Sequence, residues 1–214
     1  MAELRMFRAA GQIPQASGAA AAALETRAAA WGLAVRRADD GLALSLWGGE
    51  LRLTLMGRAL RVEIAAPEDR LVGVLREALS EIMAEAGLEV AWDRLDVGAL
   101  APGLSLMRVD RVAPAGPNFI RLRLRGADAG RFATGGLHVR LLLSPAGRAA
   151  VWPRVAASGR AVWPTGADAL HRPVYTIAAQ QDDWLEILIY RHADSPTCDW
   201  AASDPLGATV GVMG

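Results

Sequence analysis

Hydrophobic residues recur at helical spacing in two parts of the first hundred residues. Leu24, Ala28 and Trp31 share one face of a helix that the pattern predicts over residues 17–32, where Ser17 can cap the start and Gly32 can end the helix. A second helix is expected between Pro67 and Gly87, because a proline and two acidic residues open it and a glycine ends it. Its apolar stripe consists of Leu71, Leu75, Leu79, Ile82 and Met83.

The hydrophobic period changes to two between these helices. Leucine occupies alternate positions in 42–46 and 51–55, on either side of a glycine turn at Gly48–Gly49, which predicts a hairpin. A third strand at 60–64 completes a meander with one apolar face, which the helices must cover. We therefore predict a two-layer α+β domain (helix, three-stranded meander, helix) over residues 18–95.

The kind of secondary structure that the sequence predicts changes after residue 95. Residues 1–17 are predicted to be a loose N-terminus, and residues 96–103 (DVGALAPG) lack periodicity and are predicted to be a linker. Residues 104–214 carry six short strand patterns with little helix, which favours an antiparallel six-stranded β-barrel. The predicted strands are 104–112, 119–125, 137–144, 174–179, 184–191 and 208–213. The interval Pro145–Leu170 is rich in glycine and proline and is expected to be an excursion from the barrel.

Composition narrows the class of protein. Of the 214 residues 52% are hydrophobic, which is enough for sizeable cores, and 23 basic residues balance 23 acidic ones at a pI near 6.8. No global field attracts nucleic acid or an anionic membrane, and no apolar stretch approaches the roughly 20 residues of a transmembrane helix. Cys198 is the single cysteine, so intramolecular disulfides are excluded and a cytoplasmic, reducing compartment is expected.

Several candidate sites have ordinary structural alternatives. Arginines at 121, 123 and 125 line one face of a predicted strand. Two interpretations are open: a phosphate-binding stripe, or charges that prevent the edge of the sheet from pairing with another strand. His138 is a catalytic candidate or a structural residue at a strand start. Cys198 is a nucleophile only with a nearby base, and otherwise a small buried thiol. The histidines are far apart and no metal-ligand motif or nucleotide-binding glycine loop is present, so we predict no metal site.

One combination of residues indicates a flavin site. Tyr175 and Thr176 supply an aromatic ring and a hydroxyl in a predicted strand. Pro196 suits the first turn of a helix in which Thr197 and Cys198 would present backbone N–H groups outward. A ring for stacking, a hydrogen bond to the ring edge and a cradle for phosphates are the groups that bind a flavin.

Residues 104–214 resemble the siderophore-interacting proteins, which are flavin-dependent members of the ferredoxin-reductase-like superfamily. The resemblance rests on several short motifs in order, which are HVRLLL from His138, Trp-Pro at 152 and 163, YT at 175, His192, PTCDWA from Pro196 and GATVGVMG at the end. Residues from about 19 to 93 resemble a small domain of unknown function that is sometimes fused ahead of that flavin module.

The resemblance implies a six-stranded barrel that binds FAD. It places Tyr175 on the isoalloxazine ring and the Thr176 hydroxyl, as the catalytic group, near the reactive N5 edge. It also implies NAD(P)H as electron donor and a ferric siderophore as substrate, so that the full-length protein would reduce ferric siderophores in the cytoplasm and release Fe(II). The implied cofactor-binding residues are Arg172, Val174, Tyr175, Thr176, His192, Pro196, Thr197 and Cys198.

The sequence departs from the family pattern in three ways. Pro173 occupies the position of the arginine in the usual Arg-x-Tyr-Thr motif, and Arg172 points away from Tyr175 unless a bulge or turn realigns it. Because proline belongs at strand starts or bulges, we expect such an irregularity, and we expect Arg172 to reach the phosphates. Cys198 replaces a common serine. The family continues beyond Gly214 into a nicotinamide-binding domain, so a chain truncated before that domain is expected.

Two other functions remain open at this point. One is a non-catalytic binding module, in which the N-terminal domain recognises a partner and the barrel is structural. The other is a general NAD(P)H:flavin reductase with a different electron acceptor. Retention of flavin separates the first from the flavoenzymes, and the choice of acceptor separates the second from a siderophore reductase.

Overall fold

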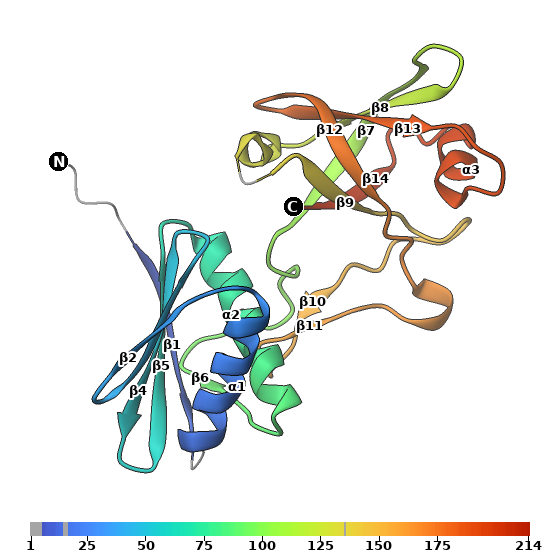
Figure 1. Ribbon diagram of the computed structural model, residues 1–214. Coiled ribbons are helices and arrows are strands. Elements are labelled where there is room, and N and C mark those ends of the chain that lie inside the picture. The colour runs from blue at the N-terminus through green and yellow to red at the C-terminus, as the bar shows by residue number, and fades with distance from the viewer. Residues whose placement is uncertain (1–5, 15–16, 135) are drawn as a thin grey trace. The chain divides into compact units, whose positions relative to one another are not determined.

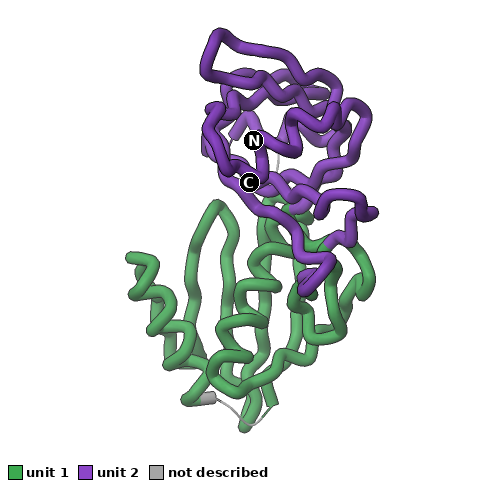
Figure 2. Tube along the Cα trace, turned by 90° about the vertical axis from the view of Figure 1, so that its right-hand side faces the viewer, with its two compact units in different colours: residues 1–103, 153–162 green, residues 104–152, 163–214 purple. Residues whose placement is uncertain are grey.

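The computed structural model describes residues 6–14, 17–134 and 136–214, and the chain divides into two compact units. Unit 1 contains the residues up to Gly103 together with Pro153–Val162, and unit 2 contains Leu104–Trp152 and Trp163–Gly214 (Figure 2). The first boundary falls at the end of the predicted linker. Residues 153–162, which the sequence assigns to the barrel domain, belong instead to unit 1. Among the described residues no helix is both long enough and apolar enough to cross a membrane.

Unit 1 is an antiparallel sheet covered on one face by two helices, α1 (Ser17–Ala30) and α2 (Asp69–Glu85) (Figure 1). The strand order is β2-β3-β4-β5-β1-β6. The strands are β1 (Phe7–Ile13), β2 (Val35–Ala38), β3 (Gly41–Leu46), β4 (Gly49–Met56), β5 (Ala59–Ala66) and β6 (Ala91–Trp92). The alternating leucines of β3 and β4 and the stripe of α2 meet in one buried core. The predicted two-layer α+β fold is therefore confirmed.

The sheet of unit 1 is wider than the predicted three-stranded meander. Strands β3, β4 and β5 form that meander, but β1 pairs with β5 along its whole length, so a loose N-terminus was wrong for Phe7–Ile13. Strands β2 and β6 form the edges. The sequence of β1, FRAAGQI, has large apolar residues only at its two ends, so it carries no period of two. Pairing of its backbone with β5 determines its conformation.

The helices of unit 1 end where the glycines predict. Gly32 and Gly87 both have left-handed backbone conformations, with φ of 69° and 72°. Trp31 lies beyond the last residue of α1 and its side chain is 42% exposed, so it does not share the buried face of Leu24 and Ala28. The predicted capping side chain of Ser17 lies outside the described part of the chain.

A short hairpin, β10 (Arg154–Val155) and β11 (Ala161–Val162), completes unit 1. Its first strand exchanges backbone hydrogen bonds with the predicted linker: the Val155 N–H donates to the Ala99 carbonyl at 2.9 Å, and the Gly98 N–H donates to the Val155 carbonyl at 2.9 Å. Its turn contains Gly159, and a Cβ atom there would lie 2.7 Å from Nε1 of Trp92. The linker and part of the predicted excursion thus stabilise each other inside unit 1.

The hairpin also contacts α2 through Glu77, and this contact predicts that the stability of unit 1 depends on pH. The Ala161 N–H donates to the Glu77 carboxylate at 3.1 Å. Burial raises the pKa of Glu77, although the hydrogen bond from Ala161 opposes the rise. A raised pKa in the folded state means that folding favours the protonated form. The stability that protonation confers is therefore present below the usual pKa of glutamate and lost as pH rises through the raised value.

Glu77→Gln is expected to remove the loss of stability that ionisation of Glu77 causes at higher pH. The amide oxygen of the glutamine can still accept the hydrogen bond from Ala161. The free energy of unfolding of wild type and variant is measured in urea at several pH values, from the usual pKa of glutamate upward. Contributions of other groups are shared by both proteins and cancel when the two free energies are subtracted. We expect the variant to gain stability relative to wild type as pH rises. A difference that is independent of pH, or that has the opposite sign, would contradict this assignment.

Unit 2 is a closed antiparallel barrel with the strand order β12-β13-β8-β7-β14-β9. The strands are β7 (Leu104–Pro114), β8 (Phe119–Arg125), β9 (His138–Leu142), β12 (Val174–Gln181), β13 (Trp184–Tyr190) and β14 (Thr209–Met213). Helix α3 (Pro196–Ala202) lies between β13 and β14, and the single turns η1 (Ala129–Ala133) and η2 (Gly166–Asp168) complete the unit. The predicted six-stranded barrel is confirmed, and all six of its strands match the predicted ranges within two residues.

Candidate functional site

The site begins where Pro173 interrupts the pairing between β9 and β12. On one side of the proline, His171 and Leu143 exchange two backbone hydrogen bonds of 2.9 and 3.0 Å. The Pro173 carbonyl accepts from the Leu141 N–H at 2.9 Å, and β12 itself starts at Val174. Proline has no N–H to donate, so its position just before the strand costs no ladder hydrogen bond. The predicted irregular start of the strand is confirmed.

Tyr175 joins β12 to the first turn of α3. Its half-buried ring packs against the barrel core, and its hydroxyl lies near the Thr197 side chain. The Thr197 side chain is buried, and its Oγ1 lies 2.9 Å from Nε2 of His171. Burial raises the pKa of Tyr175, while the neighbouring Thr197 side chain opposes the rise, so the phenol remains neutral around neutral pH. This trio, Tyr175, Thr197 and His171, fixes the strand start against the helix start.

Thr176 faces a different neighbour. The register of β9 and β12 places Thr176 opposite His138, and Oγ1 of Thr176 lies 3.2 Å from Nδ1 of His138. Both side chains are exposed, whereas the adjacent Tyr175 is half-buried, as expected for successive residues of a strand. The exposed Thr176 hydroxyl is therefore held by an imidazole and remains accessible from solvent.

The guanidinium of Arg172 lies over the ring of Trp163, 5.1 Å from its centroid. Among the described residues it has no hydrogen bond to Thr197 or Cys198, the residues with which it was expected to share the phosphates. A guanidinium over an indole is held by cation–π attraction, which leaves its N–H groups free at the ring edge. The expected contact of Arg172 with phosphate stays a prediction.

The start of α3 is only partly available to a ligand. Ser195 is buried and caps the helix, because its Oγ accepts from the Cys198 N–H at 3.3 Å. The Cys198 thiol donates to the Tyr190 carbonyl at 3.4 Å. Pro196 has no N–H. The predicted cradle is thus reduced, since one of its two N–H groups already has a partner, and the cofactor roles of Pro196, Thr197 and Cys198 stay predictions.

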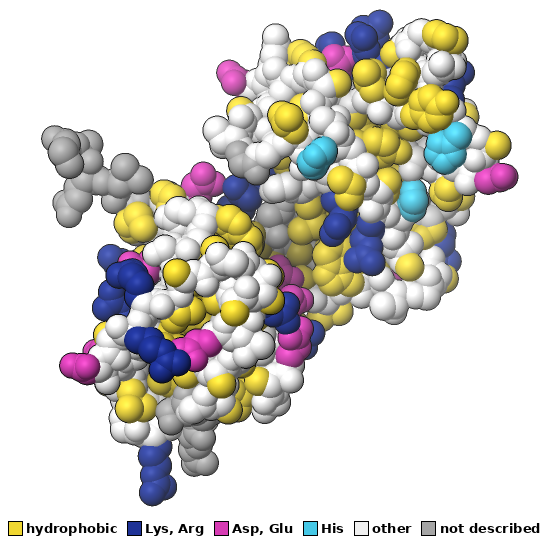
Figure 3. Space-filling view, in the orientation of Figure 1, with side chains coloured by type: hydrophobic (Ala, Val, Ile, Leu, Met, Phe, Trp, Pro, Cys, Tyr) yellow, Lys and Arg dark blue, Asp and Glu magenta, His cyan; other side chains and the backbone are white. Residues whose placement is uncertain are grey.

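His192 lies in a strip of exposed aromatic side chains. Its ring is stacked on Tyr190 at a centroid distance of 6.4 Å, and Tyr190 meets Phe119 edge to face at 5.4 Å. Nδ1 of His192 lies 3.0 Å from the Ala193 carbonyl. Figure 3 shows histidine side chains in cyan and exposed hydrophobic ones in yellow on the visible face of unit 2. An aromatic strip of this kind can receive a planar ring.

A cavity of about 660 Å³ opens beside the trio. His171 and Pro196 contribute to its wall, together with the loop 143–148 and with Asp199 and Trp200 of α3. Its volume suits a cofactor-sized ligand, and its wall combines apolar surface with a few polar groups. The residues present fit a flavin dinucleotide: they offer a half-buried aromatic ring, an accessible hydroxyl and a neighbouring cavity.

The three alternating arginines of β8 have acidic partners. Arg121 and Arg123 lie 3.8 and 3.3 Å from the carboxylate of Glu186, whose side chain is buried, and Arg125 pairs with Asp110 and Asp183. Arg123 also lies over Trp184, 4.1 Å from its centroid. These pairs favour a structural strand face over a phosphate-binding stripe. Within the described residues no group of three His, Cys, Asp or Glu side chains is placed to hold a metal ion.

Sequence reasoning missed two residues of the site. His171 precedes Tyr175 by four positions, so the period of two already placed it on the Tyr175 side of the chain, and this spacing could have identified it. Trp163 gave no such signal, because a loop of several residues separates it from Arg172. His138 was a reserve candidate, and its contact with Thr176 now connects it to the site.

The sequence of the barrel matches a known protein family. The profile of the siderophore-interacting FAD-binding domain family matches residues 108–214. The chain therefore belongs to this family, and the family supports FAD as the cofactor. No curated protein matches the chain.

Three solved structures are similar to the chain. The siderophore-interacting protein SipS from Aeromonas hydrophila is 21% identical with a TM-score of 0.40, over 52% of this chain and 42% of that protein. A siderophore utilization protein from T. fusca is 22% identical with a TM-score of 0.39, over 52% and 44%. The CS-b5R domains of human Ncb5or are 10% identical with a TM-score of 0.33, over 83% and 50%. The chain spans about half or less of the length of these proteins.

Proposed function

We propose that unit 2 holds FAD beside the start of β12 and that the protein is the flavin-binding portion of a cytoplasmic ferric-siderophore reductase. The observation that carries this proposal is the hydrogen-bond distance of 2.9 Å between Nε2 of His171 and Oγ1 of Thr197, which joins the start of α3 to the segment that leads into β12. This contact places Thr197 beside the strand start that carries Tyr175 and Thr176, and all three residues were expected to contact the cofactor. The membership of residues 108–214 in a siderophore-interacting FAD-binding family supports the choice of ligand.

In this proposal the residues of the site have separate roles. Tyr175 offers its ring as a stacking surface, and packing against the barrel core fixes that ring. Thr176 offers an exposed hydroxyl to the edge of the flavin, and His138 orients it from 3.2 Å. Bound FAD would supply the redox chemistry, because flavin accepts a hydride and passes on electrons one at a time. The electron donor would be NAD(P)H, and release of iron as Fe(II) would follow reduction of the ferric siderophore.

Flavin retention tests the first part of the proposal. The protein is incubated with FAD and desalted, and the flavin absorbance of the protein fraction is recorded. We expect retained flavin with altered fluorescence. A protein that folds but emerges free of flavin would contradict the cofactor site and favour a non-catalytic binding module.

Electron transfer tests the second part without NAD(P)H. The FAD-loaded protein is reduced chemically without oxygen and mixed with a ferric hydroxamate siderophore, and Fe(II) is trapped by a coloured chelator. Two Fe(III) ions should be reduced for each flavin that loses two electrons. Equal or faster oxidation by free flavin or ferric citrate would instead identify a general flavin reductase.

A further inference from the structure

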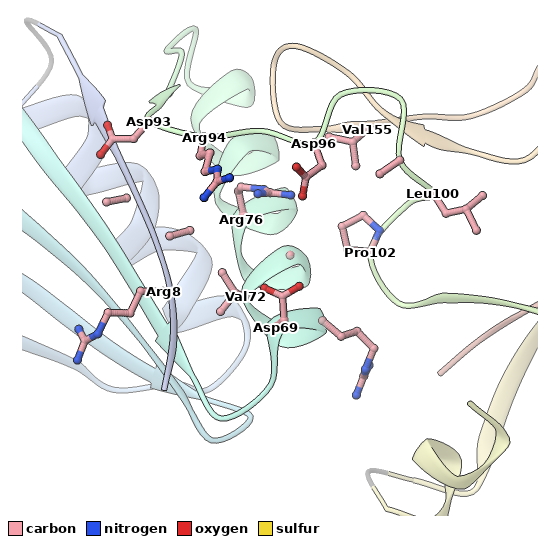
Figure 4. Close-up of a pocket in the computed structure, with 15 residues that line it drawn as sticks. Arg8, Asp69, Val72, Arg76, Asp93, Arg94, Asp96, Leu100, Pro102 and Val155 are labelled. Atoms are coloured by element: carbon pink, nitrogen blue, oxygen red, sulfur yellow. The ribbon is translucent and has the colours of Figure 1, made fainter. Parts of the chain in front are cut away.

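Unit 1 has a cavity of its own, of about 640 Å³. Strand β1, the beginning of α2, the segment after β6 and Val155 of the hairpin surround it (Figure 4). All these residues belong to unit 1, so the cavity is independent of the flavin site. Its size is in the range of sites that bind small organic molecules.

Two arginine side chains in this cavity lack acidic partners. Arg76 extends from α2 and Arg94 from the segment after β6, both line the cavity, and the guanidinium of Arg76 is directed toward Asp96 (Figure 4). Asp93, also in the wall, is engaged by Arg61 at 2.7 Å. Among the described residues neither Arg76 nor Arg94 lies within ion-pair distance of a carboxylate. Two guanidinium groups that line one cavity without ion-pair partners favour the binding of an anion there.

The guanidinium of Arg76 has unused hydrogen-bonding capacity at its Nε atom. It is buried and has no hydrogen-bond partner among the described residues. Buried donors are nearly always satisfied, and leaving one unpaired is costly. The N–H groups of a guanidinium form a planar fork that matches the two oxygens of a carboxylate or a phosphate.

The remaining wall of the cavity selects between these anions. Asp69 and Asp96 also line it and repel a doubly charged phosphate more strongly than a singly charged carboxylate, and Arg70 in the same wall already pairs with Glu68 at 3.3 Å. Val72, Leu100 and Pro102 supply apolar surface for the body of the molecule. We propose that unit 1 is a binding site for a small organic carboxylate, with Arg76 and Arg94 holding the carboxylate group.

Calorimetric titration of the full chain with 4-phenylbutyrate tests this site without reference to flavin. We expect saturable binding, with at least about tenfold weaker binding in Arg76→Gln and in Arg94→Gln, since each removes a charge-assisted hydrogen bond. Arg94 is exposed, so its variant keeps the test valid if Arg76→Gln is unstable. Arg8→Gln is the matched control: Arg8 lines the same cavity but points away from Arg76 and Arg94 (Figure 4), and its loss should leave binding unchanged.

Two further ligands complete the experiment. The neutral 4-phenylbutyramide should bind at least about tenfold more weakly than the acid, because it lacks the charge. Inorganic phosphate should bind more weakly as well. The proposal is overturned if 4-phenylbutyrate does not bind, if the amide or phosphate binds as tightly, or if the Arg94 variant binds like wild type. None of these outcomes depends on whether unit 2 retains FAD.

Discussion

Tyr175→Ala is expected to lower the affinity for FAD by about 30- to 100-fold. An aromatic ring stacked on a planar base contributes about 1–3 kcal/mol, and a loss of about 2–3 kcal/mol corresponds to that range. The contact between His171 and Thr197 is left in place, so the start of β12 stays joined to α3 and the change reports on the ring. Titration of the protein with FAD, followed by flavin fluorescence, measures the change.

Two companion variants separate the ring from other effects. Tyr175→Phe keeps the ring and loses only the hydroxyl near Thr197, so about a tenfold loss or less is expected. Trp184→Ala removes an aromatic ring at the far end of the β12–β13 hairpin and should leave FAD affinity unchanged. If the alanine variant of Tyr175 binds FAD like wild type, or if Trp184→Ala weakens binding equally, Tyr175 is not the stacking residue.

Gly159→Ala is expected to destabilise unit 1 by about 2–4 kcal/mol. A non-glycine residue at its φ of 79° costs about 1 kcal/mol, and overpacking costs about 1–3 kcal/mol more. The added Cβ would lie 2.7 Å from Nε1 of Trp92 and 3.0 Å from Oγ of Ser80, two atoms joined by a hydrogen bond. The hairpin must then move away from α2, or the Trp92–Ser80 bond must break.

Gly57→Ala is the matched control for this variant. Gly57 has a similar φ of 66° and lies in the same unit, but nothing lies within 4 Å of a Cβ there. It therefore carries the conformational cost without the overpacking. Hydrogen exchange by mass spectrometry should show lost protection in α2 and in residues 153–162 for the Gly159 variant alone. Equal destabilisation by the two variants would show that the hairpin does not pack closely against Trp92.

The sequence predicted the elements that bury a periodic apolar face. The three meander strands, the two helices of unit 1 and all six barrel strands have such a face, because a strand or helix at the edge of a core must repeat its apolar residues with its own period. It could not predict β1, β2 or β6, whose residues are mostly small or polar. These strands form because their backbone groups pair with the backbone of a neighbouring strand. A local pattern of apolar residues contains no information about that pairing.

The candidate site also has features that the sequence predicted and features that only the tertiary structure shows. The sequence by itself determined the residue types of the flavin site and the irregular strand start at Pro173, since proline acts through its own covalent geometry. Only the tertiary structure decided which side chains meet: His171 with Thr197, His138 with Thr176, and Arg172 with Trp163. It also assigned residues 153–162 to unit 1. Contacts between residues distant in sequence depend on how closed sheets bring strands together, and no local spacing encodes that closure.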